Sequence, residues 1–146
     1  MIKVLIKKLI TNFISIIFKG KIGRFIQNEM ALQLMVFQKN VEHNGCNMRF
    51  TVPNMLNYFR VDTFSTKEPE TLQWIDSMDD DSILWDIGSN VGLYAIYAAK
   101  KRNFKVYAFE PSVFNLELLA RNIFINNLTK KITIIPLPLS DELKVS

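Results

Sequence analysis

The feature that most constrains the fold is a glycine-containing turn between an apolar run and a helical segment. The run Ile83–Trp85 leads into Asp86-Ile87-Gly88-Ser89-Asn90-Val91-Gly92, and Leu93–Lys101 follows as a segment rich in Ala and Tyr. A short apolar run is typical of a buried strand. Gly88 permits a tight turn, and Gly92 lets a helix and a strand approach closely. A strand, a glycine turn and a helix in this order bring the backbone close to a nucleotide ligand.

The segments that follow continue the alternation of strand and helix. Lys105–Phe109 is predicted to be a second strand, Ser112–Asn126 a helix and Ile132–Ile135 a third strand. The order β-α-β-α-β predicts an α/β, Rossmann-like fold with a parallel sheet and right-handed crossovers. A helical arm precedes the predicted sheet.

The acidic residue after the second strand narrows the class of ligand. Glu110 follows Asp86 by 24 positions, where a carboxylate is placed to accept both hydroxyls of a ribose. The turn is not a G-x-G-x-x-G loop, because Asn90 occupies the second glycine position, and no G-K-S/T sequence is present. A nucleoside without a pyrophosphate fits both observations. S-adenosylmethionine is the leading candidate, and an oxidoreductase that binds a nicotinamide dinucleotide is the alternative.

Four motifs in order resemble the FkbM family of S-adenosylmethionine-dependent methyltransferases. The resemblance covers about residues 58–142 and leaves the N-terminal arm unexplained. The motifs are Lys67-Glu68-Pro69-Glu70-Thr71 with Trp74-Ile75, Asp86 to Tyr94, Phe109-Glu110-Pro111 with Asn115, and Leu139-Ser140-Asp141.

The resemblance implies a class I methyltransferase fold and methylation of a hydroxyl oxygen on a sugar or natural product. The acceptor would then be a small molecule or a glycan. The family's domain continues through further strands, so the resemblance implies that the parallel sheet of this chain is incomplete after its third strand. The chain would then be a fragment that is inactive alone. The acceptor pocket and the general base would lie in the missing C-terminal part of the domain. No catalytic residue is assigned.

The resemblance also assigns roles to the predicted cofactor-binding residues. Backbone N–H groups at Gly88, Asn90 and Gly92 would face the methionine carboxylate, and Asp86 would hold its ammonium or cap the next helix. Glu110 would bind the ribose. Asp141 would accept the adenine amino group or lie in a solvated loop. Glu68 and Thr71 would border the site or serve in helix capping.

The sequence predicts no metal site. Asp79, Asp80 and Asp81 are contiguous, so we expect a solvated loop, and the chain has one cysteine, Cys46, and one histidine, His43. A single cysteine fits a reducing compartment, which favours a cytoplasmic protein.

The N-terminal arm carries the positive charge of the chain. Residues 1–40 hold seven basic residues and one acidic residue, against a net charge of +4 for the whole chain. The remainder is mildly acidic, which argues against a nucleic-acid partner. Residues 2–18 form an amphipathic pattern with a basic polar side, although the charge-free stretch is shorter than a membrane span requires. Packing on the chain or pairing with another chain is favoured, and contact with a membrane surface stays open.

Three segments follow from this pattern. The first is a basic helical arm over residues 1–40, and it includes a second helix over Phe25–Gln38. The second segment, residues 41–78, holds strands and a helix. The third is the nucleotide-binding half-domain over residues 79–146. Within the middle segment, Arg49–Val52 and Tyr58–Val61 are predicted to be extended, and a helix is predicted from Pro69. A non-catalytic fragment whose basic helix docks on a membrane or a partner is a further alternative.

Overall fold

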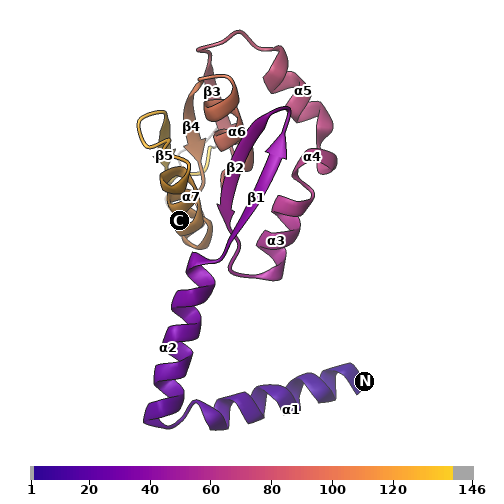
Figure 1. Ribbon diagram of the computed structural model, residues 1–146, viewed down its shortest axis with the longest axis vertical. Coiled ribbons are helices and arrows are strands. Elements are labelled where there is room, and N and C mark those ends of the chain that lie inside the picture. Colours follow the sequence, from indigo (N-terminus) through magenta and orange to yellow (C-terminus); the bar gives the residue numbers. More distant parts are fainter. Residues whose placement is uncertain (1, 140–146) are drawn as a thin grey trace. The chain divides into compact units, whose positions relative to one another are not determined.

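The computed structural model describes residues 2–139 and divides the chain into two compact units, Met1–Phe37 and Gln38–Ser146 (Figure 1). We call the first unit the arm and the second the α/β unit. Among the described residues, no helix combines the length and apolar character needed to cross a bilayer.

The arm consists of two helices, α1 (Ile2–Ile17) and α2 (Lys21–Val36). Helix α1 follows the predicted amphipathic pattern, whereas α2 begins before the predicted Phe25 and ends before Gln38. Gly20 adopts an extended conformation as the N-cap of α2. A Cβ atom at Gly23 would lie 2.1 Å from the carbonyl oxygen of Ile17, so a glycine is required where the two helices approach.

The α/β unit opens with an antiparallel hairpin of β1 (Gln38–His43) and β2 (Cys46–Thr51). Residues 38–40, which the sequence analysis assigned to the arm, therefore belong to β1. Three helices follow: α3 (Met55–Asp62), α4 (Phe64–Lys67) and α5 (Pro69–Ser77). Helix α5 begins at Pro69, as predicted.

The prediction of an extended segment over Tyr58–Val61 is wrong, because these residues lie within α3. Asn54 is the N-cap of this helix, and its side-chain oxygen accepts a hydrogen bond from the backbone N–H of Asn57 at 3.0 Å. This contact satisfies one of the N–H groups that a helix start leaves without an acceptor. The cap, together with burial of Val61 in the core, outweighs the strand preference of the local residues.

The predicted parallel sheet is confirmed. It contains β3 (Ile83–Ile87), β4 (Lys105–Phe109) and β5 (Ile132–Ile135) in the spatial order β3-β4-β5. The crossovers are α6 (Leu93–Lys101) and α7 (Val113–Ile125). This alternation is the Rossmann-like arrangement that the sequence predicts.

One face of this sheet forms the core. Leu84 of β3, Val106 of β4 and Ile132 of β5 are buried there, where α6 packs against β3 and β4 and also against β2 of the hairpin. The opposite face bears Ile83, Trp85 and Ile87, which are all exposed. The prediction of a fully buried strand at Ile83–Trp85 is therefore wrong for one face. The reason is that the crossover and the hairpin cover a single side of β3.

Two asparagines tie α7 to the hairpin. The fully buried Asn122 accepts from the Thr51 N–H at 2.7 Å and donates to the Val91 carbonyl oxygen at 2.9 Å. Asn126 contacts the Arg49 backbone in both directions, at 3.1 and 2.7 Å. A buried amide with partners on all sides has few alternative arrangements, so these contacts set the position of α7.

Candidate functional site

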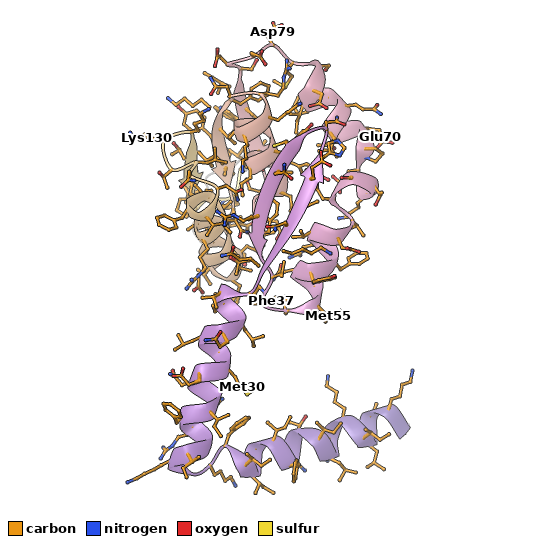
Figure 2. All side chains as sticks on the ribbon, viewed as in Figure 1. Met30, Phe37, Met55, Glu70, Asp79 and Lys130 are labelled. Atoms are coloured by element: carbon orange, nitrogen blue, oxygen red, sulfur yellow. The ribbon has the colours of Figure 1, made fainter. Side chains whose placement is uncertain are left out.

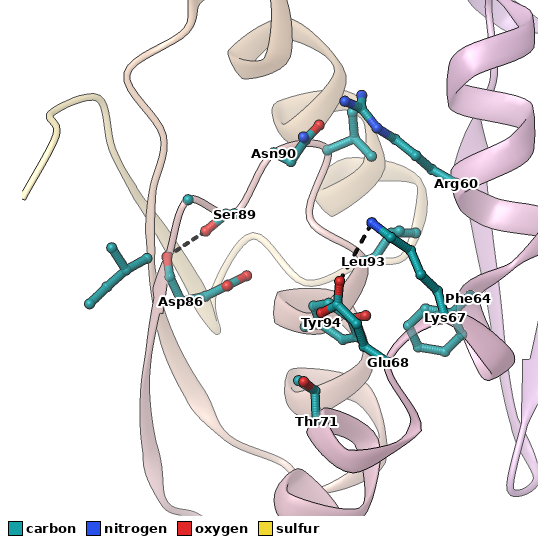
Figure 3. Close-up of a pocket in the computed structure, with 13 residues that line it drawn as sticks. Arg60, Phe64, Lys67, Glu68, Thr71, Asp86, Ser89, Asn90, Leu93 and Tyr94 are labelled. Atoms are coloured by element: carbon teal, nitrogen blue, oxygen red, sulfur yellow. Dashed lines mark hydrogen bonds and ion pairs between the residues drawn. The ribbon is translucent and has the colours of Figure 1, made fainter.

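A pocket of about 340 Å³ lies where the turn after β3 faces helices α3 to α5 (Figure 3). This volume falls within the range of small-molecule sites. Residues of the helices form one wall, and the turn with the start of α6 forms the other. The lining residues are Arg60, Phe64, Lys67, Glu68 and Thr71 on the first wall, and Asp86–Val91, Leu93 and Tyr94 on the second.

The backbone of the turn is held by hydrogen bonds to the neighbouring strand. The N–H groups of Gly88 and Ser89 both donate to the Phe109 carbonyl oxygen at 2.9 Å, and the Gly92 N–H donates to the Ser89 carbonyl at 2.8 Å. Gly88 and Gly92 have φ values of +78° and +87°, which L side chains adopt at a cost. The two glycines therefore permit the conformation that these bonds hold.

Glu110 joins this turn to the loop after β4. Its carboxylate accepts from the Asn90 N–H and from the Ser112 N–H, each at 2.8 Å, and the residue is buried. Glu110 is not among the residues that line the pocket. Each carboxylate oxygen has a second lone pair, so bonding to a ribose stays compatible with this bracing contact. The sequence did not predict the bracing contact.

The predicted role of the turn's N–H groups is not supported. The N–H groups of Gly88, Asn90 and Gly92 already donate within the chain, so they are not free for a ligand carboxylate. The first N–H groups of a helix have no acceptor within that helix. In α6 this first turn includes Leu93 and Tyr94, which line the pocket.

Gly92 has a packing role. A Cβ atom at this position would lie 2.5 Å from the Leu119 Cδ1 atom and 3.5 Å from the Ile96 Cδ1 atom. The close approach at Gly92 is therefore to side chains of α6 and α7, whereas the prediction was an approach of a helix to a strand. Gly92 itself does not line the pocket, whereas Gly88 and Asn90 do.

Asp86 is a half-buried acid on the pocket wall. Burial raises the pKa of its carboxyl group above the ordinary value, and the backbone N–H of Ala95 acts in the opposite direction by hydrogen bonding. Its Oδ2 atom is buried and has no hydrogen-bond partner in the described part of the chain, and the same holds for Oδ1 of Asn90. A buried acceptor without a donor is costly. A cationic or hydrogen-donating ligand would satisfy both atoms.

The helical wall carries two cations, and its Glu68 pairs with the Tyr94 phenol of the other wall. The Lys67 Nζ atom lies 3.5 Å from Glu68 Oε1, and Figure 3 shows Arg60 and Lys67 reaching from the helical side toward the turn. Burial raises the pKa of the Tyr94 phenol well above its usual range, and a hydrogen bond with Glu68 adds to the shift. The phenol therefore stays protonated and acts as a donor.

The sequence analysis missed Arg60 and Phe64 as lining residues. It assigned Tyr58–Val61 to a strand, whereas Arg60 lies in α3 and Phe64 begins α4. The spacing of Asn54 and Asn57 was the available signal, because an asparagine at that position is a common helix N-cap. Glu68 and Thr71 do border the pocket.

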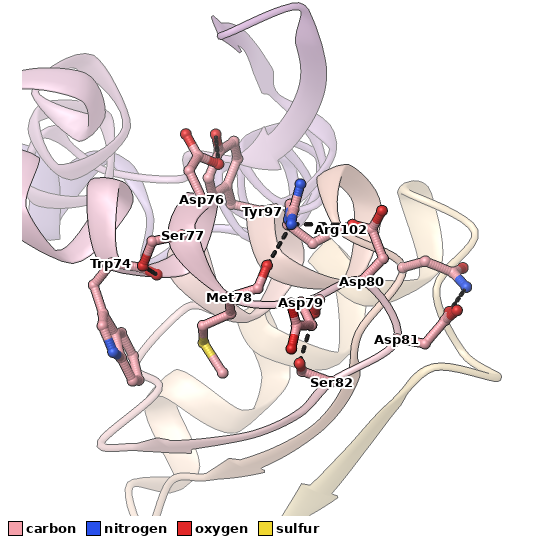
Figure 4. Close-up of polar contacts among 11 residues, drawn as sticks. Trp74, Asp76, Ser77, Met78, Asp79, Asp80, Asp81, Ser82, Tyr97 and Arg102 are labelled. Atoms are coloured by element: carbon pink, nitrogen blue, oxygen red, sulfur yellow. Dashed lines mark hydrogen bonds and ion pairs between the residues drawn. The ribbon is translucent and has the colours of Figure 1, made fainter.

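The three aspartates before β3 have separate partners (Figure 4). Asp80 forms an ion pair with Arg102 at 3.2 Å, Asp81 accepts from the Asn103 side chain, and the Asp79 carbonyl oxygen accepts from the Ser82 hydroxyl at 2.6 Å. Within residues 2–139, no three acidic, histidine or cysteine side chains are grouped to hold a metal. Asp141 lies outside the described residues.

Comparison with known proteins gives one curated relative and several structural neighbours. No family model matches the chain. A hexuronic acid methyltransferase, AglP of Haloferax volcanii, is 31% identical over 81 residues, which are 56% of this chain and 33% of that protein. The chain thus spans about a third of the length of this relative.

Two solved structures extend the comparison to the fold. Pyrococcus horikoshii TYW2, in complex with MeSAdo, aligns with a TM-score of 0.50 and 17% identity, over 69% of this chain and 36% of the other. M. jannaschii TYW2, in complex with AdoMet, aligns with a TM-score of 0.49 and 21% identity, over 67% and 42%. The first alignment supports the Rossmann-like fold that the strand order already indicates.

Proposed function

We propose that the chain binds S-adenosylmethionine in the pocket beside the turn after β3 and serves in methyl transfer to a hydroxyl oxygen. The Rossmann-like sheet puts this turn at the carboxyl end of a parallel strand, which is the usual ligand edge of such a sheet. The turn lacks the sequence that binds a pyrophosphate. The curated relative is itself a methyltransferase.

The observation that carries the proposal is the unpartnered Oδ2 atom of Asp86. It is a buried acceptor on the pocket wall, and the methionine part of the cofactor carries an ammonium group that would supply the missing donors. The first-turn N–H groups of α6 would suit the cofactor carboxylate. Glu110 lies at the end of β4, where it would contact the ribose. The described residues therefore fit this cofactor.

When bound, S-adenosylmethionine supplies an electrophilic methyl group for an in-line displacement. The residues of the chain have to orient the two reactants and exclude water. Phe64 and Leu93 give the pocket apolar surface, and the protonated Tyr94 is positioned by Glu68. No general base is assigned among these residues.

An acidic sugar is the acceptor class that the pocket favours. Arg60 and Lys67 line the wall opposite the turn, and arginine binds carboxylates with two parallel hydrogen bonds. The relative named above acts on a hexuronic acid. Membership of the FkbM family, a cytoplasmic location and the absence of a nucleic-acid partner stay predictions.

Calorimetry on the full chain tests the proposal. We expect S-adenosylhomocysteine to bind and NAD to give no measurable heat. Asp86→Asn should weaken binding of S-adenosylhomocysteine, because the amide replaces one acceptor oxygen with an NH₂ donor and removes the charge that faces the ammonium. Tighter binding of NAD than of S-adenosylhomocysteine would overturn the proposal and support the oxidoreductase alternative.

Glu110→Ala provides a second test. Loss of a charge-assisted hydrogen bond costs about 1.5–3 kcal/mol, so the affinity for S-adenosylmethionine should fall roughly 10- to 150-fold. Glu117→Ala is the matched control, since Glu117 is exposed and forms an ion pair with Arg121 on its own helix. Because Glu110 also braces the turn, circular dichroism should accompany each titration. Parental affinity in a folded Glu110→Ala chain would remove the ribose assignment.

A further inference from the structure

Helix α1 of the arm has one broad apolar face that α2 does not cover. Its large apolar side chains are exposed, with Leu9 at 61% and Phe13 at 66%. The apolar face consists of Leu5, Ile6, Leu9, Ile10, Phe13, Ile14, Ile16 and Ile17, whereas Val4, also exposed, lies on the polar side of the helix. Exposed apolar surface of this extent marks an interaction site.

The other face of α1 is basic and polar. Lys3, Lys7 and Lys8 are exposed, and the Thr11 hydroxyl donates to the Lys7 carbonyl oxygen at 2.9 Å. The helix holds no acidic residue. Figure 2 shows nitrogen-tipped side chains leaving α1 on one side. Lysines at the borders of an apolar face can extend their ammonium groups toward a polar layer while their stems contact apolar material.

We propose that α1 docks on the surface of an anionic lipid bilayer, with its apolar face in the acyl boundary. The charge of the arm favours a lipid bilayer over another copy of the arm as the surface that covers this face. The arm, residues 1–37, carries six basic residues and one acidic residue, so two arms would repel each other, whereas anionic lipid headgroups attract them. A basic, amphipathic helix with Leu, Ile and Phe on one face has the composition of an interfacial helix.

Co-sedimentation of the full chain with vesicles tests this proposal. We expect binding to vesicles of phosphatidylcholine with phosphatidylserine, weaker binding to phosphatidylcholine alone, and a decrease with added salt. Lys7→Gln with Lys8→Gln should lower the partition coefficient roughly 25-fold, at about fivefold for each lysine. Lys105→Gln with Lys130→Gln removes the same charge from exposed positions of the α/β unit and should leave binding unchanged.

A fluorescence experiment tests which face enters the bilayer. Phe13 and Ser15 lie about 160° apart around α1, so Phe13→Trp and Ser15→Trp report on opposite faces. Lipids brominated in the acyl chains should quench the Phe13→Trp chain more strongly than the parent, whose Trp74 and Trp85 give the background. The Ser15→Trp chain should resemble the parent.

Three results would overturn the proposal. They are equal binding to neutral and anionic vesicles, equal quenching of the two tryptophan variants, and a concentration-dependent oligomer without vesicle binding. The last result would assign the apolar face to another copy of the chain. None of these results depends on the cofactor, so the test is independent of the function proposed above.

Discussion

The arm and the α/β unit are both rich in apolar residues, but they place them differently. In the arm, Phe13 is exposed on α1, whereas in the α/β unit Phe50 of β2 is fully buried between the hairpin and α6. Two helices that approach each other at Gly23 cannot enclose a core, while a sheet, a hairpin and crossover helices can. Phenylalanine therefore lies in the core of the α/β unit but on the exposed surface of the arm.

The largest expected effect contrasts two phenylalanines. Phe50→Ala should lower the free energy of unfolding by about 3–5 kcal/mol, because it leaves a cavity in the core. Phe13→Ala removes the same atoms from an exposed position and should change it by less than about 0.5 kcal/mol. Urea denaturation followed by circular dichroism measures both. Similar losses for the two variants would show that the arm is packed in solution.

Substitutions at the two glycines of the turn test how tightly the α/β unit is packed there. Gly92→Ala combines a strained φ with a contact of 2.5 Å to Leu119, and should cost about 2–4 kcal/mol. Gly88→Ala introduces the strain of a positive φ without a close contact, since nothing lies within 4 Å of its Cβ position. It should lower the free energy of unfolding by about 1–2 kcal/mol. Equal losses in thermal unfolding would show that Leu119 adjusts without cost.

The half-buried Asp86 of the α/β unit should oppose folding at neutral pH. Because burial raises the folded-state pKa of Asp86 above its ordinary value of 3.8, unfolding releases a proton at pH values between 3.8 and the folded-state pKa. Its contribution to stability is thus complete below about pH 3.8 and is lost as the pH rises through the folded pKa. Asp86→Asn should unfold at a higher temperature than the parent above pH 4, with little difference at lower pH.

The smallest expected effect tests the independence of the two units. Lys7→Gln with Lys8→Gln should change the affinity for S-adenosylhomocysteine by no more than about threefold, because the arm supplies no residue to the described pocket wall. Calorimetry under the conditions used for the parent chain measures this. A loss beyond about tenfold would show that the arm contributes to the site.

The fold could be predicted where local signals and tertiary packing agree. Strands β4 and β5 and helix α6 occur at the predicted residues. Gly92 precedes α6, and both strands are short apolar runs that are followed by a proline, Pro111 or Pro136. The prediction of a strand at Tyr58–Val61 was wrong, because a capping contact from Asn54 stabilises a helix there. It failed also at Trp85, since sequence alone does not tell which face of a strand a helix covers.

The candidate site was predicted only in part for the same reason. Asp86, Gly88 and Asn90 lie on the pocket wall because they belong to one turn, which is a local property of the sequence. The opposite wall comes from α3 to α5, so Arg60 and Lys67 enter the site through packing of distant segments. The second role of Glu110, as a brace for the turn, likewise requires its approach to the Asn90 N–H.

By itself, the sequence determined the order of strands and helices, the glycine turn after β3 and the amphipathic character of α1. These follow from periodicity and backbone conformation, which act over a few residues. Only the tertiary structure decided that Asn122 links α7 to β2, that the N–H groups of the turn are already bonded, and that Asp86 keeps an unpartnered oxygen. Those outcomes depend on which distant groups meet inside the core, where each polar atom must find a partner or remain without one.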